Sequence, residues 1–169
     1  MAIFKKIAIS GKYQDDQAIP DLITYITSPA KTPNNFIDGI GVNGDDIAGS
    51  MIAVSETFGK NSKIRLHHFV VSFYPWEIKS LGNLVCVAQG ICTEIGKEHQ
   101  IVYAFHEDKD HPHLHFIFNA VSYVDGHRYR GGIKEYNELF ALVRNAVRYF
   151  LGRDVISVNY KPQNGNPHE

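Results

Sequence analysis

The sequence has almost no excess charge of either sign and no long apolar run. Its 17 Lys and Arg residues balance 18 Asp and Glu residues, and the formal net charge at pH 7 is −1. Proteins that bind nucleic acid without sequence preference usually carry a basic surplus. A nucleic-acid role would therefore depend on local basic residues or on a metal. No apolar segment approaches the roughly 20 residues of a membrane helix, so no membrane segment is expected.

Cysteine is also scarce. Cys86 and Cys92 are the two cysteines, and both lie in one segment with a helical pattern. This usage excludes a disulfide framework and predicts reduced core residues of a cytoplasmic protein. The N-terminal segment, MAIFKKIAIS, lacks the apolar stretch and the small-residue cleavage site of a secretory signal. We therefore expect a cytoplasmic location.

The chain of 169 residues, 44% of them hydrophobic, is long enough for about one domain. We assign residues 1–158 to a single domain and residues 159–169 to a polar tail or the start of a linker. Alternation and β-forming residues predict strands at 3–9, 36–42, 66–74, 101–106, 113–121 and 154–158. Periodicity and capping residues predict a short helix opened by Pro20, a helix capped by Asp45 or Asp46 that ends at Gly59, and helices at 76–95 and 134–150.

The strands at 101–106 and 113–121 are joined by the short charged turn at 107–112. Such a pair must be antiparallel. The expected fold class is therefore α+β, with a mostly antiparallel central sheet and a histidine pair on a central strand. We expect the helices to pack on one face of that sheet.

Histidine is abundant, with nine residues, and four of them lie between positions 106 and 115. Successive side chains of a strand point to opposite faces. In the strand from residue 113, one face therefore carries His113, His115, Ile117 and Asn119. The other face carries Leu114, Phe116, Phe118 and Ala120. The apolar set that begins with Leu114 is typical of a core face. The set that begins with His113 is unusual for a sheet unless something binds there.

His106 ends the preceding strand, so a hairpin would bring it beside His113 and His115. Three imidazoles favour a divalent metal such as Zn, Mn, Co or Ni and leave a coordination position open, as in catalytic sites. The alternative is a solvent-facing histidine row, or core histidines bonded to backbone. His111 is either a fourth ligand, a proton carrier or a surface residue. Asp108 either orients an imidazole or is a turn residue.

The segment from His106 to Asn119, HEDKDHPHLHFIFN, resembles the three-histidine motif of conjugative relaxases, the mobilisation nucleases of the MOBP class. These nucleases belong to a larger group of endonucleases with a His-hydrophobic-His strand. Residues 22–32, LITYITSPAKT, resemble the N-terminal tyrosine motif of that family, and residues 65–74, RLHHFVVSFY, resemble its second motif. The resemblance extends over residues 25–158. In this range the sequence is similar to relaxases from integrative elements of Gram-positive bacteria.

The resemblance implies an enzyme that nicks and rejoins one DNA strand at a transfer origin. In such enzymes a tyrosine attacks the scissile phosphate, stays joined to the 5′ end and leaves a free 3′ hydroxyl. The matching tyrosine is Tyr25, with Tyr123 and Tyr129 as reserves. The resemblance also implies one divalent ion (Mn, Mg, Zn, Co or Ni) held by His106, His113 and His115. Single-stranded transfer-origin DNA would be the substrate, with accessory relaxosome proteins as a further class of partner.

Other polar residues fit around such a site. His68 and Ser72 share the polar face of the strand at 66–72, and with Asp108, His111 and Asn119 they are expected to support the metal or the phosphate. Basic and hydroxyl side chains can hold DNA phosphates. The candidates are Lys31, Thr32, Arg65, Arg128, Arg130 and Lys134. The alternative for such residues is an ordinary solvated face.

Two other functions compete. The alternation of His111, His113 and His115 also resembles the histidine-triad motif of metal-free nucleotide hydrolases. That interpretation leaves the segments at 22–32 and 65–74 unexplained, and Pro112 fits poorly in the strand it needs. The second competitor is a metal-bearing DNA-binding module that does not cut.

Overall fold

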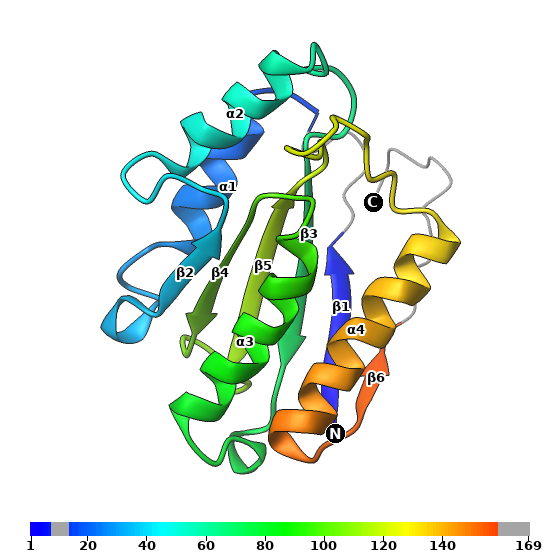
Figure 1. Ribbon diagram of the computed structural model, residues 1–169. Helices are drawn as coiled ribbons and strands as arrows, with labels where there is room; N and C mark the ends of the chain where they lie inside the picture. The colour runs from blue at the N-terminus through cyan, green and yellow to red at the C-terminus, as the bar shows by residue number, and fades with distance from the viewer. Residues whose placement is uncertain (8–13, 159–169) are drawn as a thin grey trace, which may run out of the picture.

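Six segments rich in β-branched and aromatic residues pair into one sheet, with the order β2-β4-β5-β3-β1-β6 (Figure 1). The computed structural model describes residues 1–7 and 14–158. The strands are β1 (Ala2–Ile7), β2 (Ile37–Ile40), β3 (Leu66–Ser72), β4 (Ile101–His106), β5 (His113–Asn119) and β6 (Val155–Ser157). The helices are α1 (Ala18–Ile26), α2 (Ile47–Thr57), α3 (Leu81–Ile95) and α4 (Ile133–Leu151), with 3-10 turns at Pro33–Asn35 and Pro75–Glu77.

The strand pairing confirms the predicted α+β class. The pairs β2–β4, β4–β5, β3–β5 and β1–β3 are antiparallel, and β1–β6 is parallel. The β4–β5 hairpin places His106 directly opposite His113 and Ala104 opposite His115. The histidine pair therefore lies on a central strand that is flanked by β4 and β3.

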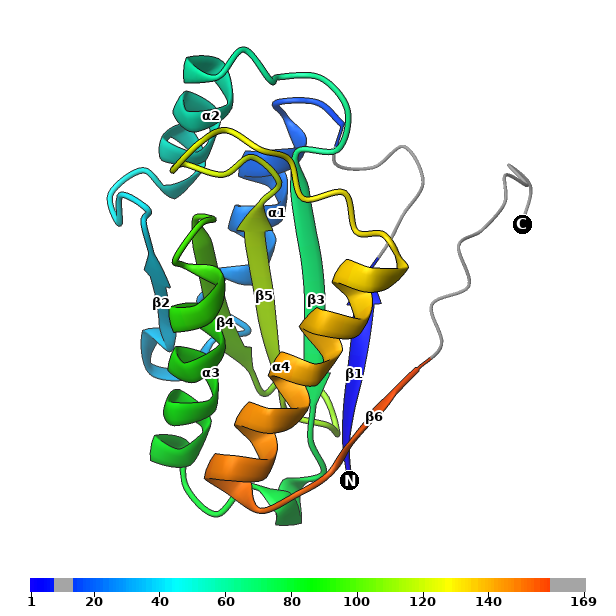
Figure 2. The same ribbon diagram turned by 45° about the vertical axis from the view of Figure 1, so that its right-hand side comes forward.

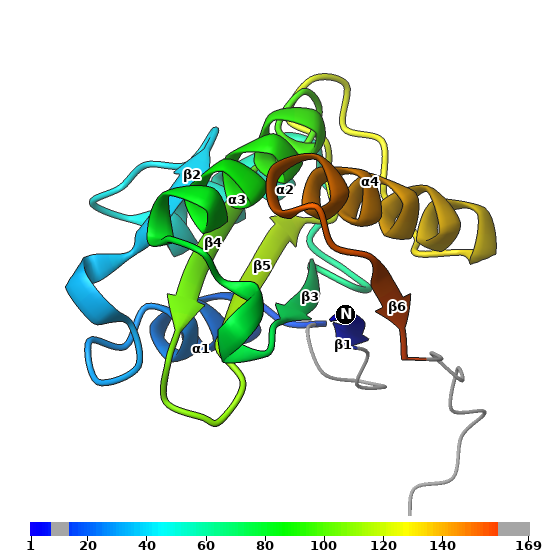
Figure 3. The same cartoon turned by 90° about the horizontal axis from the view of Figure 1, so that it is seen from below.

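Helices cover both faces of the sheet, so the expectation of a single covered face is wrong. On one face α3 and α4 lie side by side over Leu114, Phe116 and Phe118 (Figure 2). On the other face, α1 (Figure 3) and α2 cover Val102 and Ile117. These two apolar side chains occupy the same face as the histidines, and their burial gives the second pair of helices something to pack against.

The caps of α2 and α3 explain where these helices begin. Asp46 accepts a hydrogen bond from the Gly49 N–H at 2.9 Å, which selects it over Asp45 as the cap of α2. Ser80 accepts from the Asn83 N–H at 3.2 Å, so α3 begins at Leu81 and not at residue 76.

Helix α3 packs one side on the core, and Ile78, which lies before the helix, packs against the same core. The buried residues are Leu84, Val87, Ala88, Ile91 and Cys92. Cys92 is a core thiol as expected, but Cys86 is exposed, and both are free.

Two predicted segments extend beyond the described residues. Residues 8 and 9 of the first expected strand and the polar tail at 159–169 lie outside them. Among the helices of residues 1–7 and 14–158, each is too short or too polar to cross a lipid bilayer.

Candidate metal centre

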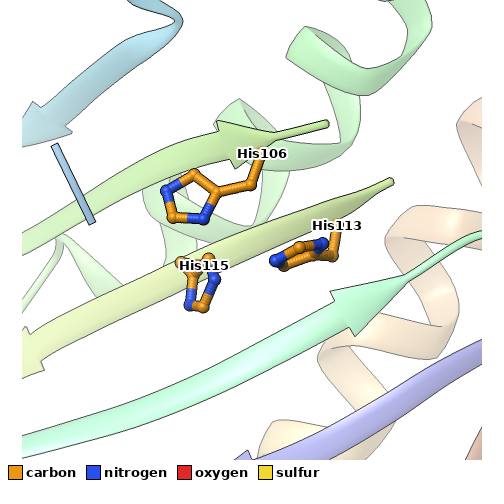
Figure 4. A group of neighbouring side chains, drawn as sticks. All are labelled: His106, His113 and His115. Atoms are coloured by element: carbon orange, nitrogen blue, oxygen red, sulfur yellow. The ribbon is translucent and has the colours of Figure 1, made fainter. Parts of the chain in front are cut away.

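His106, His113 and His115 form a buried cluster at one end of the β4–β5 hairpin (Figure 4). The ring centroids lie 4.3 Å apart for His106 and His115, 4.8 Å for His113 and His115, and 5.3 Å for His106 and His113. One ring nitrogen of each residue lies within 4.8 Å of the corresponding nitrogens of the other two. This is the convergence that strand alternation and the hairpin predict.

In each of the three imidazoles, one ring nitrogen is within hydrogen-bond distance of a neighbouring group and the other is not. His106 Nε2 lies 2.7 Å from the Ile26 carbonyl, and His113 Nδ1 lies 2.9 Å from the His111 carbonyl. His115 Nδ1 lies 2.9 Å from Nε2 of His68. The remaining atoms are His106 Nδ1, His113 Nε2 and His115 Nε2.

The surroundings of these remaining nitrogens show whether the cluster suits a metal ion. His106 Nδ1 and His115 Nε2 are buried without a hydrogen-bond partner among the described residues. Buried polar atoms without partners are rare in native proteins. Metal-bound histidines usually have the opposite ring nitrogen held by a hydrogen bond, as all three do here. The donor set therefore fits a divalent metal ion.

Burial also keeps the three imidazoles neutral. Desolvation lowers the pKa of His106 and His113, and it lowers the pKa of His115 to about 2, with nearby His68 as the next cause. At neutral pH the lone pairs of these rings are therefore available, and no proton has to leave before a metal binds.

Tyr25 lies against this cluster. Helix α1 buries Leu22, Ile23 and Ile26 against the sheet, and this leaves Tyr25 at the edge with its side chain 42% exposed. Its ring centroid lies 5.8 Å from that of His115 and 6.2 Å from that of His106, edge-on to both. The structure thus brings together two motifs that are 80 residues apart, since the Ile26 carbonyl also bonds His106.

Lys31 lies after α1 in the chain, and its side chain contacts Tyr25. Its Nζ lies 4.0 Å from the centroid of the Tyr25 ring and 4.0 Å from a carboxylate oxygen of Asp108. The Lys31 side chain is 30% exposed, so its charge faces the solvent next to the phenol. Of the predicted phosphate ligands, Lys31 is the one that contacts Tyr25.

An open cleft of about 1000 Å³ leads to the cluster. Residues of strands β1, β3 and β5 and of helix α1 line it. Tyr25, His113 and His115 line it. The predicted auxiliary residues His68, Ser72 and His111 also line it, and Ser72 pairs with His113 across β3 and β5.

Two of the predicted auxiliary residues lie outside the group of three imidazoles. His111 is exposed in the turn before β5, and its ring contacts Tyr74 edge-on at 4.9 Å. It is not part of the ligand group found in the described residues. Asn119 is buried at the far end of β5, where its amide donates to the Met51 carbonyl and to Gln100 Oε1, each at 2.9 Å. The structure therefore does not bring Asn119 to the cluster, because its polar atoms are used in packing.

Three predicted phosphate ligands form hydrogen bonds within the protein. The Thr32 hydroxyl is buried and donates to the Ile26 carbonyl at 3.2 Å. Arg65 is fully buried, pairs with Asp16 and donates to the Asn61 carbonyl at 2.9 Å. Arg128 donates to the Ile64 and Lys60 carbonyls. These side chains connect loops through hydrogen bonds to backbone carbonyls.

The remaining two candidates lie away from the cleft. Arg130 is exposed, and Lys134 is exposed and lies 3.8 Å from Glu138. Both belong to the segment where α4 begins, at the end of the sheet opposite to His113 (Figure 1).

One surface feature was missed in the sequence. Trp76 is 72% exposed and stacks on Tyr74 with ring centroids 4.6 Å apart. Tyr74 contacts His111, which lines the cleft. The signal was a lone tryptophan in a Pro-Trp turn directly after a predicted strand. Exposed aromatic pairs of this kind can stack on nucleic-acid bases.

The fold and the histidine cluster agree with the comparisons with known proteins. The relaxase family described as "MobA/VirD2-like, nuclease domain" matches residues 25–148, so the chain belongs to that family. The MOBP-class resemblance read from the three motifs is thereby confirmed. The match begins at Tyr25 and includes the whole histidine segment.

Three curated relatives match parts of the chain. The "Protein rlx" of Staphylococcus aureus is 31% identical over 80 residues, covering 46% of this chain and 24% of that protein. The "Group II intron-interrupted relaxase LtrB" of Lactococcus lactis subsp. cremoris is 26% identical over 147 residues, covering 68% of this chain and 25% of that protein. The "Protein TraI" of Escherichia coli is 30% identical over 77 residues, covering 45% of this chain and 10% of that protein. The chain thus spans about a quarter or less of their length. No solved structure matches it significantly.

Proposed function

We propose that the domain nicks one strand of transfer-origin DNA by attack of the Tyr25 phenol on a backbone phosphate. The observation that supports this most directly is the position of Tyr25, which lines the cleft and lies edge-on against His106 and His115. The family match to residues 25–148 supports this chemistry. We assign residues 1–158 to the catalytic domain and place its reaction in the cytoplasm, where the free thiols of Cys86 and Cys92 stay reduced.

The reaction is a transesterification. The Tyr25 oxygen forms a bond to phosphorus, the bond from phosphorus to the 3′ oxygen breaks, and the proton lost by the phenol is balanced by one gained at the 3′ oxygen. The products are a 5′-phosphotyrosine link and a free 3′ hydroxyl, and the energy kept in the link allows rejoining. When bound by His106, His113 and His115, a divalent ion would supply Lewis-acid stabilisation of the phosphate charge.

The chain's own residues orient the reactants. Lys31 places a positive charge at 4.0 Å from the Tyr25 ring, where it can attract the phosphate and the developing phenolate. His68 holds the ring of His115 through its Nδ1. Tyr74 and Trp76 offer a stacking surface for a base of the single strand next to the cleft. The chain has a net charge of −1, so it lacks the positive surplus that attracts DNA without sequence preference. Accessory relaxosome proteins would supply the missing affinity for DNA.

The histidine-triad alternative has less support. That chemistry needs His111, His113 and His115 to alternate within one strand, whereas β5 begins at His113 and His111 lies exposed in the turn. The third imidazole of the cluster comes from His106 on the neighbouring strand.

Covalent trapping tests the proposal. The chain is incubated with single-stranded oligonucleotides tiled across the DNA flanking its gene, with Mn²⁺, Mg²⁺ or Zn²⁺ or with a chelator. We expect a protein–DNA adduct on denaturing gels with metal and none with chelator. Tyr25→Phe should bind the same strand and form no adduct, while Tyr149→Phe, a variant of an exposed tyrosine on α4, should behave like the wild type. An adduct with Tyr25→Phe would refute the proposed nucleophile. Binding without any adduct would favour the non-cutting module.

A further inference from the structure

A second group of side chains of the types that bind metals lies at the opposite end of the sheet. Glu98 and His99 lie in the turn between α3 and β4, and His127 lies in the loop after β5. One ligand atom from each lies within 4.8 Å of those of the other two. The His99 and His127 rings meet edge to face at 5.1 Å, and His127 Nε2 lies 4.0 Å from a Glu98 carboxylate oxygen. Within residues 1–7 and 14–158, this is the one such group besides the His106 cluster.

In both imidazoles, Nδ1 is within hydrogen-bond distance of an oxygen atom, and Nε2 is the nitrogen that could bind a metal. His99 Nδ1 lies 2.8 Å from the Asn119 carbonyl, and His127 Nδ1 lies 2.6 Å from the Asp125 carboxylate. A carboxylate or carbonyl behind each ring is the arrangement that orients metal-bound histidines. His99 is 5% exposed, and its burial lowers its pKa, so the ring is neutral at neutral pH.

The backbone already holds the two segments together. The Tyr123 N–H donates to the Glu98 carbonyl at 3.1 Å, and the Ser122 N–H donates to the His127 carbonyl at 2.8 Å. Gly126 has a φ of +74°, a conformation that glycine adopts without strain, and it turns the loop just before His127. Ligand positions that are set before binding reduce the entropy cost of holding an ion.

We propose that Glu98, His99 and His127 form a second divalent-metal site that links the α3–β4 turn to the loop at 121–128. Two imidazoles and one carboxylate suit a borderline ion such as Zn²⁺, with water in the remaining position. Asp125 acts as a positioning residue for His127. The site is independent of the nicking proposal, since the length of β5 separates it from His113 by about 20 Å.

Metal stoichiometry tests this site in a background that lacks the first cluster. The full chain with His113→Ala and His115→Ala is dialysed against Zn²⁺, and bound metal is measured by atomic emission. We expect one Zn²⁺ per chain. Adding Glu98→Gln or His127→Asn should lower the affinity for Zn²⁺ on the order of 100-fold or more, and Asp125→Asn should lower it roughly 10- to 100-fold.

The variants added to this background replace exposed side chains, so that folding does not decide their outcome. Glu98 and His127 are exposed, whereas His99 is buried and is left unchanged. Glu94→Gln is the matched control, because Glu94 is an exposed glutamate on α3 that pairs with Lys97. It should keep full Zn²⁺ binding, and Zn²⁺ should raise the Tm of this control but not that of His127→Asn. Absence of bound Zn²⁺ in the background protein, or equal binding with His127→Asn, would overturn the site and leave the Tyr25 adduct test unaffected.

Discussion

Nε2 of His68 lies 2.9 Å from Nδ1 of His115, and the two rings stack with their centroids 5.1 Å apart. When Nδ1 of His115 carries the proton, it donates to His68 and leaves Nε2 of His115 free for a cation. His68 comes from β3 and His115 from β5, so the pair also joins the second and third motifs of the sequence.

His68→Ala is expected to weaken metal binding roughly 10- to 100-fold, since His115 loses the group that orients it. His68→Gln keeps an acceptor and should recover most of the affinity. Calorimetric titration with Mn²⁺ or Zn²⁺ in a His127→Asn background measures this without the second proposed site. His67→Gln is the control, because His67 points to the other face, where it stacks on Phe118. Unchanged affinity in His68→Ala would mean that packing alone orients His115.

Trp76→Ala is expected to reduce affinity for single-stranded DNA. Stacking of one base on an aromatic side chain contributes about 1–3 kcal/mol, which corresponds to roughly 5- to 150-fold in Kd. Fluorescence anisotropy with a labelled oligothymidylate measures the change, and Trp76→Phe should retain most of the affinity. Tyr149→Ala removes an aromatic side chain that is exposed on α4 and should have no effect. Equal affinity for Trp76→Ala and wild type would exclude this stacking surface.

Asn119→Ala is expected to destabilise the fold and leave metal binding intact. The Asn119 amide donates to the Met51 carbonyl and Gln100, and its oxygen accepts from the Val121 N–H at 3.0 Å. Losing these bonds leaves buried groups unpaired, at a cost of roughly 3 kcal/mol in the free energy of unfolding. Urea denaturation measures this, with exposed Asn137→Ala as the control. A loss of metal affinity without a loss of stability would instead return Asn119 to the metal site.

Acid should destabilise the metal-free protein through its buried histidines. Burial, followed by the charge of Lys6, lowers the pKa of His67 to about 3. The unfolded chain then binds more protons than the folded chain at any pH between that value and the ordinary pKa of about 6.5. This contribution to stability is complete above the ordinary pKa and is lost as the pH falls toward 3.

At pH 5 the loss from His67 is about 2 kcal/mol, because each pKa unit corresponds to about 1.4 kcal/mol. Urea denaturation at pH 7.5, 6 and 5 in the presence of chelator checks the trend. In His67→Gln the free energy of unfolding should fall less steeply with acid than in the wild type. Parallel curves for the two proteins would show that His67 does not contribute.

Much of the fold follows from local patterns. Alternation along β5 correctly separates His113 and His115 from Leu114 and Phe116, because each strand residue must face the side opposite to its neighbour. The short turn before His113 correctly requires an antiparallel hairpin with His106. These are properties of adjacent residues, and they can be read without knowledge of distant contacts.

The sequence by itself therefore determined the α+β class, the hairpin and the convergence of three imidazoles. Only the tertiary structure decided that Arg65 and Thr32 are buried, that Asn119 bonds to Met51, and that helices cover both faces. It also decided that His127 meets Glu98 and His99. Burial and side-chain pairing depend on segments far apart in the chain, and a basic or polar residue looks the same in a sequence whether it faces solvent or a carbonyl group.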